Sequence, residues 1–177
     1  MNPVPETSPC QKVAISACLL GLPVRYDGGD KAWPLVAALE RLGVCWLPFC
    51  PEAECGLGVP RESMRLQGDP EQPRLVTLVT GIDHTERLLA WSGERLERLA
   101  AAGVAGFLFK SRSPSCGLGS TPVHDTLGDG RAAPGSGLFA RACGQRFSAL
   151  PQSDAELLAD EPALRAFLAR LAVTGRV

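Results

Sequence analysis

Short apolar runs recur along the chain, and each one ends in glycine, proline or polar residues. Runs of this length and setting predict buried strands. The predicted strands are 13–16, 44–49, 106–109 and 147–150. Apolar residues at helical spacing predict helices between and after them. The predicted helices are 32–41, 83–102, 136–143 and 160–170, with Ser153 and Glu156 as a capping box before the last.

Two further segments do not follow this alternation. The runs 64–66 and 75–79 predict a small hairpin, with 67–73 as its loop. Residues 120–135 hold five Gly or Pro and show no periodicity, which predicts a long loop. The hairpin is therefore expected to be an insertion in the main strand and helix pattern.

Strands that alternate with helices predict an α/β fold with a mostly parallel sheet and helices on both faces. The expected architecture is a Rossmann-like three-layer fold with the small β-hairpin insertion. The chain of 177 residues shows no internal repeat and no linker, so it predicts one domain over 1–177, with 1–11 as a loose N-terminal tail. Sheets of this kind bind ligands beyond the carboxyl ends of their strands.

Composition narrows the possible partners and the compartment. The chain is 45% hydrophobic and 21% charged, with a net charge of -1, which gives no reason to expect nucleic acid or an anionic membrane as a partner. No apolar run approaches the ~20 residues of a membrane span. The first residues lack the pattern of a signal peptide, so a cytoplasmic protein with reduced thiols is predicted.

Seven cysteines remain to be explained, and their odd number and irregular spacing argue against a disulfide framework. Cys18, Cys50 and Cys116 each lie just past a predicted strand, and the ends of parallel strands meet at one edge of a sheet. Zinc prefers a closed set of four ligands, and the paired Cys-x-x-Cys spacing that commonly supplies them is missing. A [4Fe–4S] cluster held by three thiolates leaves one iron open as a Lewis acid, and suits this chain better.

The other cysteines have simpler interpretations. Cys10 is expected to be incidental, and Cys45 and Cys143 to pack as small core residues. Cys55 stays open between a spare ligand and an ordinary loop residue.

The segment 110–117 leaves the predicted strand 106–109 abruptly and carries two cations, three serines and a cysteine. Such a loop is often a site, although a serine-rich surface turn is the plain alternative. The Asp27-Gly28-Gly29 stretch is either a simple turn or a place where backbone approaches a flat base closely.

Five motifs, in this order, together resemble the thiouracil desulfidase family: 16–21, 25–29, 49–52, 58–61 and 110–117. The resemblance runs from about Val13 to the closing helix. It implies a [4Fe–4S] cluster on Cys18, Cys50 and Cys116, with the thiocarbonyl sulfur of a thiolated uracil binding the fourth iron. It also implies acid/base chemistry by Glu52 and Ser113.

The predicted function is therefore non-redox desulfuration of a thiolated uracil, 2-thiouracil or a similar base, releasing uracil and hydrogen sulfide. Residues expected to bind the small thiolated pyrimidine are Asp27, Gly28, Gly29, Arg61, Lys110, Ser111 and Ser115. One alternative is a metal- or cluster-stabilised module that binds nucleotides or a partner without catalysis. Another is an electron carrier with Cys55 as a fourth ligand.

Overall fold

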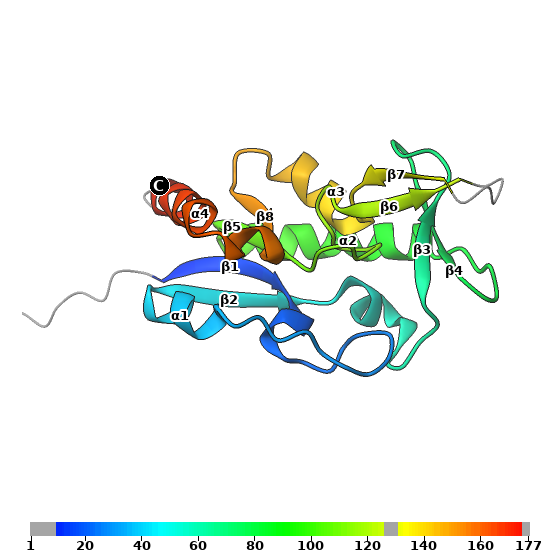
Figure 1. The fold of residues 1–177 in the computed structure, drawn as a ribbon, viewed down its shortest axis with the longest axis horizontal. Helices are drawn as coiled ribbons and strands as arrows, with labels where there is room; N and C mark the ends of the chain where they lie inside the picture. Colours follow the sequence, from blue (N-terminus) through cyan, green and yellow to red (C-terminus); the bar gives the residue numbers. More distant parts are fainter. Residues whose placement is uncertain (1–9, 126–130, 175–177) are drawn as a thin grey trace, which may run out of the picture.

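The computed structural model describes residues 10–125 and 131–174, and strands alternate with helices through most of this length (Figure 1). The strands are β1 (Gln11–Ser16), β2 (Val44–Phe49), β3 (Met64–Gln67), β4 (Arg74–Thr77), β5 (Gly106–Phe109), β6 (Thr121–His124), β7 (Ala132–Gly135) and β8 (Gln152–Asp154). The helices are α1 (Val36–Arg41), α2 (Thr85–Ala101), α3 (Leu138–Arg146) and α4 (Glu161–Thr174). Three short helical turns join them: η1 (Ala17–Leu20), η2 (Ala53–Leu57) and η3 (Ala155–Ala159).

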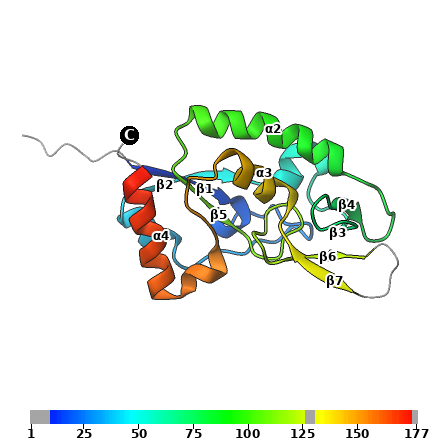
Figure 2. The same cartoon turned by 90° about the horizontal axis from the view of Figure 1, so that it is seen from above.

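The first sheet has four strands in the order β2-β1-β5-β8, and every neighbouring pair is parallel. Side chains alternate between its faces, as they must in a strand. Ala14 and Phe107 pack with α2 and α3 in one core, whereas Val13 and Leu108 pack with α1 and α4 in another. Helices therefore cover both faces, and α2 and α4 lie on opposite sides of the sheet (Figure 2). The prediction of a three-layer α/β fold is confirmed.

The second sheet is larger than the predicted hairpin insertion. Its order is β4-β3-β6-β7, with β3 parallel to β6 and the outer pairs antiparallel. The prediction of a loop over 120–135 is wrong, because β6 and β7 lie within it. These strands are short and contain Pro122 and Pro134, so they carry no periodic signal. β6 pairs with β3, a segment far away in the sequence, and β7 pairs with β6.

Three smaller predictions also fail. The last strand is β8 at 152–154, and residues 147–150 form a turn before it. The capping box at Ser153 does not form, because Ser153 lies in β8. The carboxylate of Asp154 is used elsewhere: it accepts hydrogen bonds from the Leu118 N–H at 2.8 Å and from the Ser120 hydroxyl. α1 begins at Val36, four residues later than expected.

Cys10 and Cys45 form a disulfide, which contradicts the expectation that both are free. The pairing of β1 with β2 aligns Gln11 with Val44 and places the Cα atoms of Cys10 and Cys45 5.7 Å apart. The bridge depends on strand pairing across 35 residues, so spacing could not reveal it. Among the described residues, no helix is long and apolar enough to cross a membrane.

Candidate functional site

A cavity of about 250 Å³ lies where β1, β2 and β5 end, and it takes its walls from the segments that follow these strands and from the segment that leads into β3. Cys18, Cys50 and Cys116 all line it. The parallel order of the sheet is the reason, because it carries three segments distant in sequence to one edge. The structure thus brings together the three cysteines that the sequence singled out.

Each cysteine is held by its own backbone surroundings. Cys18 lies in η1, which ends at Gly21 with a φ of 82°, and its carbonyl accepts from the N–H groups of Gly21 and Lys31 at 3.2 and 2.9 Å. The Cys50 thiol donates to the Val24 carbonyl at 3.6 Å. The Cys116 N–H donates to the Ser113 hydroxyl at 3.3 Å. The thiols are therefore positioned by three separate turns.

The electrostatics of the cavity disfavour thiolates without a cation. Burial, reinforced by Cys116 and Cys50, raises the pKa of the Cys18 thiol to about 12. Burial likewise raises the pKa of Cys50 to about 11 and also raises the pKa of Cys116. Metal ions in this cavity would supply positive charge and so favour the thiolate form of the cysteines, which ligation requires.

The donor set fits a cluster better than a single ion. Nowhere in 10–125 or 131–174 do three His, Cys, Asp or Glu side chains come close enough to hold one metal ion. Three thiols that line one cavity supply the ligand type that holds an iron–sulfur cluster. The Ser111 hydroxyl is buried without a hydrogen-bond partner and lines the same cavity, so a polar group remains available there for a ligand.

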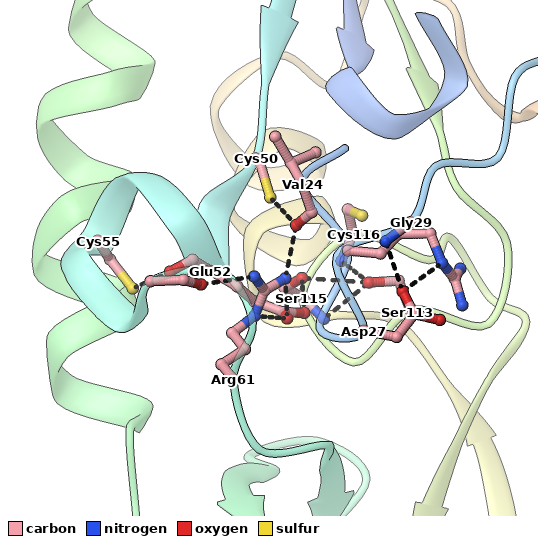
Figure 3. A network of polar contacts seen from close by, with 12 residues as sticks. Val24, Asp27, Gly29, Cys50, Glu52, Cys55, Arg61, Ser113, Ser115 and Cys116 are labelled. Carbon is pink, nitrogen blue, oxygen red and sulfur yellow. Dashed lines mark hydrogen bonds and ion pairs between the residues drawn. The ribbon is translucent and has the colours of Figure 1, made fainter. Parts of the chain in front are cut away.

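Glu52 enters the cavity from the turn after β2 and is almost fully buried. Its Oε2 accepts a hydrogen bond from Nε of Arg61 at 2.8 Å and lies 2.8 Å from Nη2 of Arg61 in an ion pair (Figure 3). Arg61 also donates to the carbonyls of Gly58 and Val24, at 2.9 and 3.0 Å. Nε, Nη1 and Nη2 of Arg61 are thus each engaged within the protein, and its contact with Glu52 is a two-point ion pair. The geometry supports a role in holding Glu52, and the predicted role of Arg61 in binding substrate stays a prediction.

Two serines extend this network toward the cysteine loop. The Ser115 hydroxyl donates to Oε1 of Glu52 at 2.7 Å, and it lies 3.1 Å from the Ser113 hydroxyl (Figure 3). Because the Ser115 proton points to the carboxylate, the proton between the serines comes from Ser113. The result is a directed chain of hydrogen bonds from Ser113 through Ser115 to Glu52.

The cysteine loop is fixed by close contact with α3. Gly137 precedes this helix, and a Cβ added there would lie 2.4 Å from the carbonyl carbon of Ser115 and 2.5 Å from the N–H nitrogen of Cys116. The helix also uses the loop to cap its first turn, since the N–H groups of Leu138 and Phe139 donate to the carbonyls of Pro114 and Ser115. Only glycine permits this approach of helix and loop.

Of the residues predicted to bind substrate, Arg61, Lys110, Ser111 and Ser115 line the cavity, whereas Asp27, Gly28 and Gly29 do not. Asp27 instead closes its own turn by accepting from the Gly29 N–H at 3.0 Å, which is the plain alternative. The Lys110 ammonium donates to the Ser111 carbonyl at 2.6 Å.

Tyr26 and Met64 are among the lining residues that were not predicted. Tyr26 lies within the motif 25–29 and could have been predicted from it. Met64 gave no signal because it belongs to the second sheet. Cys55 does not line the cavity, and its thiol donates to the Glu52 carbonyl at 3.4 Å. Cys143 is fully buried in α3, as predicted.

An α/β sheet that delivers three thiols, a paired carboxylate and two linked hydroxyls to one cavity provides the groups that an iron–sulfur enzyme needs. The sequence model of the 2-thiouracil desulfurase family matches residues 13–155, and the chain belongs to that family. The fold is similar to a solved structure described as the [4Fe-4S]-dependent thiouracil desulfidase TudS, with a TM-score of 0.67 and 31% sequence identity. That match covers 92% of this chain and 99% of the other. None of the curated proteins matches this chain in sequence.

Proposed function

We propose that this protein is a [4Fe–4S]-dependent desulfidase that converts a thiolated uracil, such as 2-thiouracil, to uracil and hydrogen sulfide without net redox change. One observation carries the proposal: three cysteines from three strand ends line a cavity together with a buried carboxylate and two serine hydroxyls. Membership of the 2-thiouracil desulfurase family and similarity to TudS support the same reaction. A cytoplasmic setting suits the free thiols of the cavity.

Cys18, Cys50 and Cys116 are the proposed ligands of the cluster, and they leave one iron without a protein thiolate. When bound, the cluster supplies a soft Lewis acid that draws electron density from the carbon of a C=S group. Water can then add at that carbon, and side chains of the protein must accept its proton and later donate one to the sulfur.

Glu52 is the proposed final acceptor of the proton from that water. Arg61 fixes Oε2 of Glu52, which leaves Oε1 to take the Ser115 proton. Ser115 then takes the Ser113 proton, and Ser113 takes the proton of the attacking water. The two transfers between side chains follow hydrogen bonds of 3.1 and 2.7 Å. The same path in reverse returns this proton to the departing sulfur. The second proton of the water leaves the new C–OH group as the C=O bond forms and completes hydrogen sulfide, so the reaction balances without an electron donor.

Substitution of the two proposed catalytic groups tests this function. In protein prepared without oxygen, Glu52→Gln and Ser113→Ala should retain the cluster but lose release of hydrogen sulfide from 2-thiouracil by about 10²-fold or more. Glu40→Gln on the exposed side of α1 and Ser153→Ala in β8 are matched controls and should keep full activity.

A non-catalytic binding module makes the opposite prediction. It requires only that the cysteines hold the structure, so both variants would behave like the wild type in every assay of function. Full desulfuration activity in Glu52→Gln would contradict the proposed mechanism.

A further inference from the structure

Glu54 closes the turn that carries both Cys50 and Glu52. Its N–H donates to the Cys50 carbonyl at 2.9 Å, and its Oε1 accepts from the Cys50 N–H at 2.7 Å. One residue therefore holds Cys50 at both its backbone donor and its backbone acceptor. Hydrogen bonds from N–H groups to a carboxylate are among the stronger ones in proteins. The proposed ligand and the proposed acid/base group lie inside this closed turn.

Arg95 reaches the same turn from α2. Its Nη1 lies 3.8 Å from Oε2 of Glu54, and its Nη2 donates to the Pro48 carbonyl. Pro48 belongs to β2, which is the outer strand of its sheet. The Arg95 side chain is largely covered, with 21% of it exposed. Arg95 thus connects a helix on one face of the sheet to the end of β2 and to the Cys50 turn.

We propose that Glu54 and Arg95 are positioning residues, which hold the Cys50 thiol and the Glu52 carboxylate in fixed positions relative to the other two cysteines. This inference rests on the proposed function and extends it to two side chains that do not line the cavity. They act through the backbone of Cys50. Loss of a partner that orients a metal ligand typically lowers metal affinity about 10–100-fold.

Amide hydrogen exchange at Cys50, measured on iron-free protein, tests the geometry without the cluster. Glu54→Ala removes the acceptor, and exchange at Cys50 should become at least about tenfold faster because the opened N–H meets water. Glu54→Gln keeps an oxygen acceptor and should restore protection. Glu94→Ala is the matched control, since Glu94 lies on α2, the helix of Arg95, in an exposed ion pair with Arg98. Equal exchange in Glu54→Ala and the wild type would overturn the inference.

The rate at which a chelator removes iron tests the functional part. Glu54→Ala and Arg95→Met should lose iron about 10-fold faster than the wild type, whereas Glu54→Gln should stay within about threefold. Rescue by glutamine separates a positioning role from a general loss of stability. If the wild type takes up no iron, the proposed function fails. If it takes up iron and Glu54→Ala loses it at the wild-type rate, this inference alone fails.

Discussion

The loss of Arg61 from its ion pair with Glu52 should destabilise the protein far more than the loss of one partner from an ion pair on the surface. Their side chains are only 11% and 6% exposed, so solvent screens them little. Arg61→Ala leaves the Glu52 carboxylate buried with the Ser115 hydroxyl as its remaining side-chain partner. Removal of one partner from a buried pair costs about 3–5 kcal/mol, because the other charge stays without compensation. We expect that loss in the free energy of unfolding of Arg61→Ala.

Denaturant unfolding of iron-free protein at neutral pH measures this free energy. The matched control is Arg165→Ala, which removes an ion pair to Glu161 of similar length whose side chains are 78% and 72% exposed. Exposed pairs contribute at most about 1 kcal/mol. The double variant Arg61→Ala with Glu52→Ala should lose less than the sum of the single variants, because the second change removes the stranded charge. A loss in Arg61→Ala no larger than in Arg165→Ala would refute the reasoning.

Two further predictions concern the cysteine loop and the cavity. Gly137→Ala should destabilise the protein by about 1–3 kcal/mol in denaturant unfolding and impair iron uptake, because its Cβ would overlap the Ser115–Cys116 backbone. The control is Gly144→Ala in α3, which should not destabilise the protein because a Cβ there meets nothing within 4 Å. Equal losses of stability in the two variants would contradict this prediction. In iron-free protein, the folded-state pKa of Cys18, about 12, exceeds the reference value of 9.0, so its contribution to stability is full below pH 9.0 and is lost as the pH rises toward 12. Unfolding measured against pH should therefore show a shallower alkaline loss for Cys18→Ser than for the wild type, and identical curves would argue against this.

The main sheet and the cysteine edge could be predicted because both depend on local patterns. Apolar runs mark β1, β2 and β5, and each of the three cysteines lies in the segment that follows one of these strands. Parallel pairing then determines where the thiols meet. The second sheet could not be predicted in the same way, since β6 depends on pairing with β3, β7 depends on pairing with β6, and neither shows periodicity of its own.

The hydrogen bonds and ion pairs within the site also could not be predicted from the sequence. Sequence spacing cannot show that Ser115 donates to Glu52 across 63 residues, or that the guanidinium of Arg61 pairs with Glu52. The motifs named the right segments, but the roles within them follow from side-chain geometry. The disulfide of Cys10 and Cys45 was missed for a similar reason, because strand pairing alone brings the two together.

The central claim is that Cys18, Cys50 and Cys116 jointly hold one cluster. Iron content with the visible spectrum, measured on protein made without oxygen, tests this claim most directly. We expect about four irons per chain in the wild type and in Cys55→Ser, and loss of both iron and colour when any of the three cysteines is replaced by serine. A wild type without iron, or a full cluster in Cys116→Ser, would contradict it.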